Sequence, residues 1–215
     1  MRQRAAVLIS GRGTNMASLV AAARDPAYPV EIALVLSNQA EAPGLALAAA
    51  SGVPTEVVAH RPFQGDRAAH EAAIDAVLRA ADVQIVCFAG YMRLLTPFLV
   101  ERWAGRMLNI HPSLLPAFPG LDTHARALAA AVKLHGCTVH LVTQAMDEGP
   151  ILAQAAVPVL ADDSAETLAA RVLAQEHLIY PLALRLFASG RSGTSPPGTA
   201  ALLNPLPTAV TPGHP

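Results

Sequence analysis

Short apolar runs alternate with longer segments rich in alanine and leucine through the first half of the chain. The apolar runs have the length and the valine, isoleucine and leucine content of buried strands, and they cover residues 5–9, 31–36, 55–58, 83–88 and 107–110. The helix-like segments between them cover residues 15–24, 43–51 and 66–81. Strands that alternate with helices are typical of βαβ units, so this pattern predicts a parallel sheet covered by helices.

The pattern changes after residue 111. Four residues that interrupt regular structure crowd the next stretch, namely Pro112, Pro116, Pro119 and Gly120. This stretch is therefore expected to be a shaped loop. The elements expected beyond it are a helix at residues 123–132, strands at 137–142 and 151–159 joined by a polar turn, and a long helix at 164–187. The whole pattern predicts an α/β fold, in which a Rossmann-like, mostly parallel, twisted sheet is flanked by helices and carries a late antiparallel strand pair.

Composition indicates a folded protein with one main domain. The 215 residues are 53% hydrophobic and only 14% charged, which is too apolar for a disordered polymer and suits a single core. Residues 1–190 are expected to form that domain. Residues 191–215 contain six of the 18 prolines and a single charged residue, Arg191, so this Pro/Gly-rich tail is expected to be disordered.

Charge and cysteine content narrow the class of partner. The formal net charge of -1, from 15 Lys and Arg against 16 Asp and Glu, provides no broad attraction for nucleic acid or a membrane, so small-molecule partners are expected. Cys87 and Cys137 lie in apolar runs without CxxC spacing, which favours a reducing compartment. The run at residues 5–9 is shorter than the roughly 7–15 residues of a signal-peptide core. The chain is therefore expected to be cytoplasmic.

The first candidate site is the glycine-rich segment Ser-Gly-Arg-Gly-Thr-Asn at residues 10–15, between the first expected strand and the first helix. Exposed backbone N–H groups and the helix dipole create an anion site there, and a phosphate would fit. Dinucleotide binding is disfavoured, because Met16 occupies the place of the third glycine of GxGxxG. A glycine turn that only reverses the chain is an equally good interpretation of this segment.

The second candidate is the pair Asn109 and His111, two residues apart at the end of the fifth expected strand. Side chains at this spacing share one face, at the sheet edge where open α/β sheets keep their ligands. An Asn amide can donate to a developing oxyanion and a His can carry a proton, which are the two operations of acyl transfer to an amine. Asp147, in the later polar turn, could reach the same crevice and favour the imidazolium. A structural histidine, a turn-forming asparagine and a solvated acidic turn remain the alternatives.

Neither a metal site nor a covalent nucleophile is expected. His70 and Glu71 begin like HExxH, but Ile74 stands where the second ligand belongs. His135 and His140 flank a cysteine, which is only a weak indication of a mixed metal cluster. No serine lies in a GxSxG context.

Three parts of the chain together resemble one family: SGRGTN at residues 10–15, AGYMRLL at 89–95 with NIHPSLLP at 109–116, and MDEGPI at 146–151. They are similar to the phosphoribosylglycinamide formyltransferases, purine-biosynthesis enzymes that use 10-formyltetrahydrofolate. The resemblance runs in order from about residue 5 to residue 188. It implies a formyltransferase fold, a catalytic domain over residues 1–190, and formyl transfer to the amine of glycinamide ribonucleotide.

The resemblance also implies roles for single residues. The implied catalytic trio is Asn109, His111 and Asp147. The positions implied to bind the ribonucleotide are Gly13, Thr14, Asn15 and Glu176. Those implied to bind 10-formyltetrahydrofolate, the co-substrate, are Arg67, Met92, Arg93, Leu94, Leu95 and Asn109. No metal is implied, and a monomer or a homodimer is expected.

Three alternatives remain. A formyltetrahydrofolate hydrolase shares the trio but gives the formyl group to water; such relatives carry an added N-terminal domain and lack the SGxGTN loop, so the transferase is favoured. Formylation of a transfer RNA is disfavoured because 215 residues leave little room for a basic RNA-binding module. A catalytically silent folate- or nucleotide-binding module is opposed by the intact trio.

Overall fold

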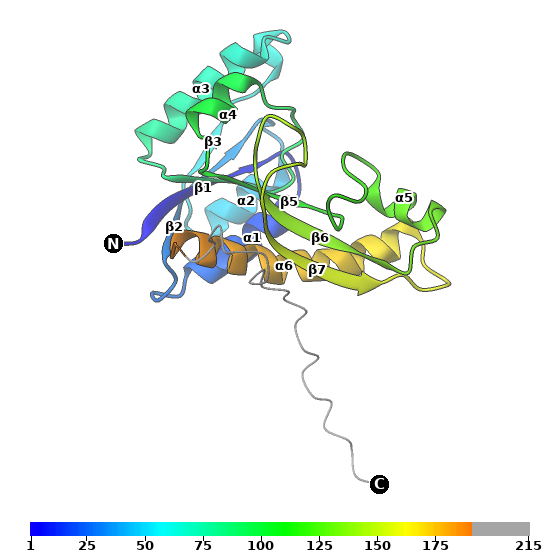
Figure 1. The fold of residues 1–215 in the computed structure, drawn as a ribbon. Helices are drawn as coiled ribbons and strands as arrows, with labels where there is room; N and C mark the ends of the chain where they lie inside the picture. Colours follow the sequence, from blue (N-terminus) through cyan, green and yellow to red (C-terminus); the bar gives the residue numbers. More distant parts are fainter. Residues whose placement is uncertain (191–215) are drawn as a thin grey trace.

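A seven-stranded sheet forms the centre of the molecule (Figure 1). The computed structural model describes residues 1–190; the tail predicted to be disordered, residues 191–215, lies outside the described residues. The sheet has the order β3-β2-β1-β4-β5-β6-β7, and its strands are β1 (Gln3–Ile9), β2 (Val30–Ser37), β3 (Thr55–Val57), β4 (Ile85–Phe88), β5 (Met107–His111), β6 (Leu134–Leu141) and β7 (Ile151–Pro158). Strands β1 to β5 pair in parallel, whereas β5, β6 and β7 pair antiparallel. The predicted α/β fold with a late antiparallel pair is confirmed.

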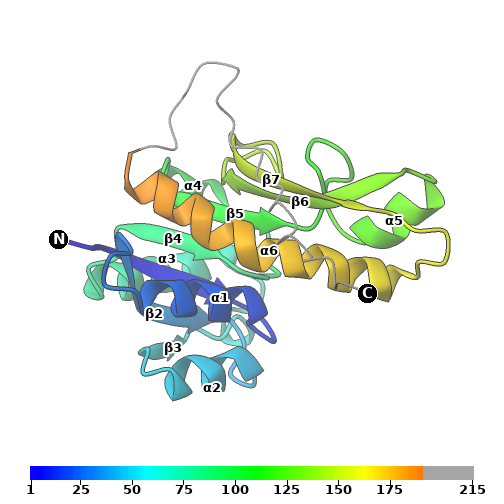
Figure 2. The same cartoon turned by 90° about the horizontal axis from the view of Figure 1, so that it is seen from below.

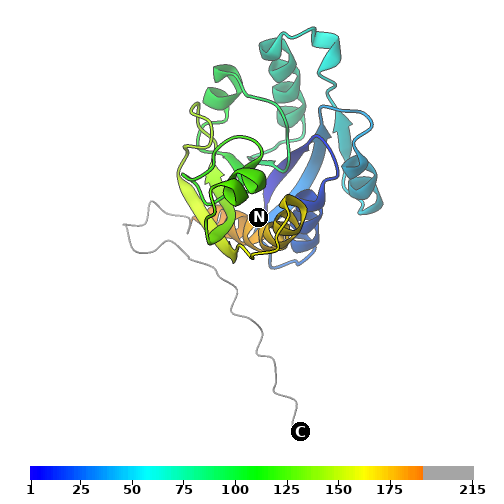
Figure 3. The ribbon, with the colours of Figure 1, turned by 90° about the vertical axis from the view of Figure 1, so that its right-hand side faces the viewer.

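Helices cover both faces of the sheet. They are α1 (Thr14–Ala23), α2 (Pro43–Ala50), the short 3-10 helix η1 (Arg61–Phe63), α3 (Arg67–Ala80), α4 (Pro97–Arg102), α5 (Thr123–Ala129) and α6 (Ala165–Ala188). Helices α1, α2 and α6 lie on one face, and α3 and α4 lie on the other (Figures 1 and 3). Helix α6 packs beside α1 and against β6 and β7 (Figure 2).

Strand β1 shows why its sequence is an unbroken apolar run. Consecutive side chains of a strand point to opposite faces of the sheet. Val7 therefore packs in the core that contains Leu19 of α1, while Leu8 packs in the second core with Ile74 of α3. Because β1 is covered on both faces, it has no solvated side.

The strand order reverses at β1, which lies between β2 and β4. At such a point the loops after neighbouring strands diverge and leave a crevice at their carboxyl ends, where α/β proteins bind ligands. The loop at residues 10–13 follows β1, the segment at residues 89–96 follows β4, and β5 ends at His111. The fold thus brings the candidate segments to one edge of the sheet.

Helix α4 and η1 were not predicted from the sequence. Helix α4 has only six residues, and it is stabilised by acidic side chains of α3. Glu71 accepts a hydrogen bond from the Thr96 N–H at its N-terminus, at 2.7 Å. Asp75 pairs with Arg102 at 2.7 Å and accepts from the indole of Trp103 at 3.0 Å. These contacts join segments distant in sequence, so no local pattern reveals them.

Most element boundaries differ from the prediction by one or two residues, and two of them differ by three. The helix expected over residues 123–132 ends at Ala129, because Ala131 takes a left-handed φ of 50° that cannot continue a helix. Strand β6 begins at Leu134, before the expected residue 137, because its first residues pair with the end of β7.

Candidate active site

Three segments bring four polar side chains together at the carboxyl end of β5. Asn109 and His111 share one face of β5. Strand β6 places His140 directly opposite Asn109, and Asp147 comes from the loop between β6 and β7. One carboxylate oxygen of Asp147 lies 3.5 Å from Nδ1 of His111, and the other lies 3.8 Å from Nε2 of His140. The amide, the imidazole and the carboxylate singled out in the sequence therefore converge.

The ring of His111 has a defined orientation. Its Nε2 lies 3.1 Å from the carbonyl oxygen of Phe118, which can only accept, so Nε2 carries a proton and Nδ1 faces Asp147. The same carboxylate accepts a hydrogen bond of 2.9 Å from the Gly120 N–H. Phe118 and Asp147 both adopt positive φ angles, 53° and 59°, in the two loops that this hydrogen bond joins. The nitrogen of His111 that can exchange a proton thus faces a carboxylate.

Buried hydroxyl groups hold the loop at residues 112–122, which is the shaped loop that its prolines predict. Thr138 of β6 donates to the carbonyl oxygen of Ser113 at 2.7 Å and accepts from the Leu115 N–H at 3.0 Å. The Thr123 hydroxyl donates to the Pro112 carbonyl oxygen at 2.7 Å. The loop that follows His111 is therefore fixed at both ends.

His140 is a member of this cluster that the sequence did not single out as a site residue. Its Nδ1 lies 3.0 Å from the Leu141 carbonyl oxygen and so carries the proton, which leaves Nε2 as an acceptor 3.2 Å from Nδ2 of Asn109. Burial lowers the pKa of His140, so the ring stays neutral and can keep this role. The i, i+2 spacing of Thr138 and His140 indicates that their side chains share one face of a strand. Which residues they lie beside follows only from the register of β6 with β5, in which His140 pairs with Asn109 and Thr138 with His111.

The glycine-rich loop is packed tightly against α2. Gly13 precedes α1 with a φ of 72°, and a Cβ added there would lie 2.9 Å from the Cα of Gly44. The Gly44 N–H donates to the Gly11 carbonyl oxygen at 3.0 Å. No side chain caps the start of α1, so the first N–H groups of this ten-residue helix are left for another acceptor. The loop has the geometry of an anion site.

Asn15 and Glu176 meet although 161 residues separate them. The Asn15 amide donates to Oε2 of Glu176 at 2.6 Å, across the contact of α1 with α6. Burial raises the pKa of Glu176, whose side chain is almost fully enclosed. The Oδ1 atom of Asn15 is buried and has no hydrogen-bond partner within residues 1–190. The pair places a carboxylate beside the first turn of α1.

Large apolar side chains are exposed on segments that border this polar cluster. Met92 and Leu94, in the extended stretch after β4, have exposed fractions of 63% and 61%. Leu121 and Met146, on the loops that carry Gly120 and Asp147, are also exposed. Exposed apolar groups gathered at the edge of a polar cluster are typical of a ligand groove.

The two arginines predicted to bind folate, Arg93 and Arg67, differ in how exposed they are to solvent. Arg93 is half-buried within the stretch after β4, next to Leu94 and Leu95. Arg67 begins α3 and is exposed, and its side chain makes no hydrogen bond or ion pair within residues 1–190. Within residues 1–190, no polar contact joins the Arg67 side chain to the other predicted site residues.

Comparison with known proteins identifies the family. The family model described as formyl transferase matches residues 3–184. The chain belongs to the formyl transferase family. The phosphoribosylglycinamide formyltransferase of Escherichia coli is 44% identical over 186 residues, which cover 86% of this chain and 87% of that protein. The bovine trifunctional purine biosynthetic protein adenosine-3 is 48% identical over 189 residues; they cover 88% of this chain but only 19% of that protein, so this chain spans about a fifth of its length.

Solved structures agree with this formyl transferase assignment. The phosphoribosylglycinamide formyltransferase of Brucella melitensis is 58% identical and superposes with a TM-score of 0.84, over 88% of this chain and 97% of that chain. The glycinamide ribonucleotide transformylase 1 of Symbiobacterium toebii is 48% identical, with a TM-score of 0.86 over 88% of this chain and 89% of that chain. The resemblance drawn from the sequence motifs is confirmed.

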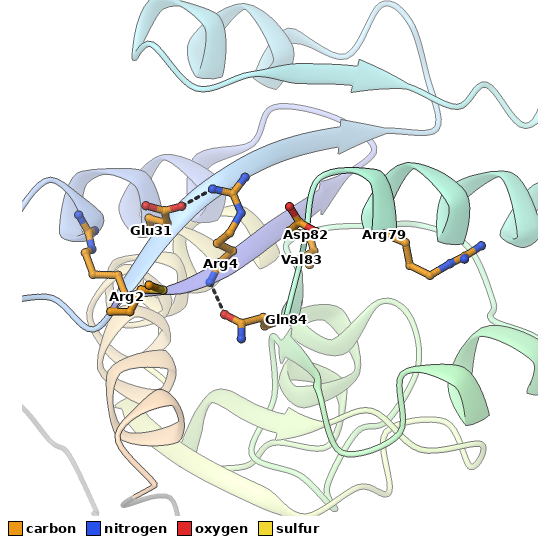
Figure 4. A pocket seen from close by; sticks show the side chains of 8 residues that line it. Arg2, Arg4, Glu31, Arg79, Asp82, Val83 and Gln84 are labelled. Carbon is orange, nitrogen blue, oxygen red and sulfur yellow. Dashed lines mark hydrogen bonds and ion pairs between the residues drawn. The ribbon is translucent and has the colours of Figure 1, made fainter.

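Two hollows lie at opposite edges of the central sheet. One, of about 620 Å³, is lined by Leu115, Met146, Asp147 and their neighbours in the loops after β5 and β6. The other, of about 680 Å³, lies at the amino ends of the strands (Figure 4). Two of its charged groups pair with each other, since Arg4 lies 2.5 Å from Glu31. Only the first hollow adjoins a predicted site residue.

Within residues 1–190, no helix has the length and hydrophobicity needed to cross a membrane. The same residues hold no group of three or more His, Cys, Asp or Glu side chains placed to bind a metal ion.

Proposed function

We propose that this protein transfers the formyl group of 10-formyltetrahydrofolate to the amine of glycinamide ribonucleotide in purine biosynthesis, giving formyl-glycinamide ribonucleotide and tetrahydrofolate. The observation that carries the proposal is the convergence of Asn109, His111 and Asp147 at the carboxyl end of β5. The proposal is supported by the phosphoribosylglycinamide formyltransferases among its relatives, of which it covers 87% to 97%.

Asn109 and His111 stabilise the oxygen of the formyl group as the substrate amine attacks its carbon. One N–H of the Asn109 amide is directed at His140, and the second is free to donate to that oxygen as it gains negative charge. His111, once protonated at Nδ1, supplies a second donor from that nitrogen, and Asp147 stabilises the positive charge from 3.5 Å. The proton lost by the amine passes through this cluster to the folate nitrogen as the carbon–nitrogen bond breaks. These roles need no metal ion and no covalent enzyme intermediate.

The substrate subsites are proposed on either side of this cluster. The ribonucleotide phosphate binds Gly13, Thr14 and Asn15 at the free N-terminus of α1, and Glu176 accepts from its ribose hydroxyls. The folate lies along residues 92–95. Met92, Leu94 and Leu95 supply apolar walls, and the backbone of Arg93 links them. Arg67 is assigned to the folate by resemblance alone.

Residues 1–190 are proposed to act as one catalytic domain, which the family match over residues 3–184 supports. Small-molecule substrates alone, a cytoplasmic location and a monomeric or homodimeric state remain predictions.

The deciding experiment mixes the protein with 10-formyltetrahydrofolate, with and without glycinamide ribonucleotide, and follows tetrahydrofolate release. Release that depends on the ribonucleotide is expected. Equal release without it would identify a hydrolase, and binding of both ligands without turnover would identify a silent binding module; either result refutes the proposal.

A further inference from the structure

A buried hydroxyl group joins the loop after β1 to the segment after β4. Ser10 opens the glycine-rich loop and is only 8% exposed. Its Oγ accepts a hydrogen bond from the Met92 N–H at 2.8 Å and donates its own proton to Oδ1 of Asn38 at 2.6 Å. Met92 is the first residue of the segment to which folate binding is assigned above. One side chain of the proposed ribonucleotide loop is therefore engaged with the proposed folate segment.

The backbone and the side chain of Ser10 have separate tasks. The Ser10 N–H donates to the Gly90 carbonyl oxygen at 3.1 Å, and the next carbonyl, that of Gly11, accepts from Gly44 at 3.0 Å. These bonds anchor the glycine-rich loop through main-chain atoms alone. Removing the hydroxyl leaves them in place and takes away the acceptor of the Met92 N–H together with the donor to Asn38.

Asn38 determines the direction of the Ser10 hydroxyl. A hydroxyl group has one proton, and because Asn38 accepts it, the lone pairs of the oxygen are left for Met92. Asn38 follows β2 and is 2% exposed. Its carbonyl oxygen lies 2.9 Å from Nδ1 of His60, which helps to fix its position. The chain of contacts thus runs from β2 through Ser10 to the segment after β4.

We propose that Ser10 is a positioning residue for folate binding and that Asn38 orients its hydroxyl group. The inference rests on the proposed function, since it concerns the same folate subsite. Residues 92–95 form no helix or strand, so hydrogen bonds such as that to Ser10 set where their backbone lies. Without the acceptor, the Met92 N–H loses its partner, and folate binding is expected to weaken roughly 5- to 100-fold.

Ser10→Ala tests the proposal, with Ser37→Ala as the matched control. Ser37 is also a buried serine at this edge of the sheet, but its hydroxyl accepts from the Gln39 N–H at 3.0 Å and not from Met92. Titration calorimetry on the full chain gives the dissociation constants of tetrahydrofolate and of glycinamide ribonucleotide. Ser10→Ala is expected to weaken only tetrahydrofolate and to raise KM for 10-formyltetrahydrofolate more than it lowers kcat. Ser37→Ala is expected to change neither ligand.

A second pair of variants tests Asn38 and does not depend on the folding of Ser10→Ala. Asn38→Asp keeps an acceptor for the Ser10 proton and is expected to bind tetrahydrofolate like the wild type. Asn38→Leu removes the acceptor and is expected to weaken tetrahydrofolate binding as Ser10→Ala does. The double variant with Ser10→Ala is expected to be no weaker than either single variant, because both act on one contact.

Three results would overturn the role of Ser10: unchanged tetrahydrofolate binding in Ser10→Ala, equal weakening of both ligands, or the same loss in Ser37→Ala. A wild-type protein that binds tetrahydrofolate but transfers no formyl group would refute the proposed function. The role of Ser10 could still be decided in that case from tetrahydrofolate binding alone. A wild-type protein that binds no folate would refute both.

Discussion

Replacing His135 with Phe should make the protein less sensitive to acid. His135 is 1% exposed, its ring nitrogens have no hydrogen-bond partner within residues 1–190, and its ring packs edge-on against those of Phe118 and His124. Burial is the main cause that lowers its pKa, the charges of His124 and His111 lower it too, and the Pro112 backbone raises it; together they bring the pKa to about 4. His135 is therefore neutral in the folded protein at neutral pH.

The sign of the effect follows from proton uptake by the unfolded chain. An unfolded histidine has a pKa of about 6.5, so between pH 6.5 and 4 the unfolded state binds a proton that the folded state does not. The contribution of neutral His135 to the free energy of unfolding is fully present above pH 6.5 and is lost as the pH falls toward 4. For this pKa shift, the free energy of unfolding drops by about 2 kcal/mol between pH 7 and pH 5. A phenylalanine of similar shape takes up no proton.

Urea denaturation at pH 7 and pH 5 measures this difference. The loss of unfolding free energy on acidification should be smaller in His135→Phe than in the wild type by about 2 kcal/mol, with an unchanged denaturant slope. The other buried histidines are present in both proteins, so their contributions largely cancel in the comparison. An equal loss in the two proteins would show that His135 is not held neutral by burial, and the reasoning would be refuted.

Three further predictions concern the proposed site. His111→Ala should lower kcat by roughly 100- to 10,000-fold and leave the calorimetric affinity for glycinamide ribonucleotide unchanged; loss of that affinity would contradict the separation of the two subsites. Glu176→Ala should raise KM for the ribonucleotide by roughly tenfold in steady-state assays, with little change in kcat, because it removes the partner of Asn15 and the proposed ribose acceptor. An effect on KM for the folate instead would count against this assignment. Gly13→Ala should destabilise the protein by about 1–3 kcal/mol in thermal unfolding, because the new Cβ would lie 2.9 Å from the Cα of Gly44 and the φ of residue 13 is positive. A variant as stable as the wild type would show that the loop can move away from α2.

The parts of the fold that were predictable are those whose cause is local. Strand β1 is an unbroken apolar run because it is covered on both faces, and the run alone shows that. Helix α4 could not be predicted in this way, because its N-terminus is held by Glu71 and its far end by Asp75, both on another helix. A six-residue segment has too few residues to show its own periodicity.

The same distinction holds for the candidate site. The spacing of Asn109 and His111 on one strand places them together without any knowledge of the rest of the chain. Asp147 lies near them through the path of a loop in which it takes a left-handed conformation and accepts from Gly120 of the facing loop, and no local pattern specifies that path. His140 depends on the pairing register of β6 with β5. The contact of Asn15 with Glu176 depends on two helices packing across 161 residues of sequence, and only the family resemblance pointed to it.

The acidic residues of α3 have a consequence for amide hydrogen exchange. Asp75, almost fully enclosed, binds Arg79 of its own helix and both Arg102 and Trp103 at the end of α4. A helix of six residues is too short to persist by itself in water. Its amide protons should therefore exchange with solvent only when α3 also opens, so that the two helices show one protection free energy and behave as a single cooperative unit.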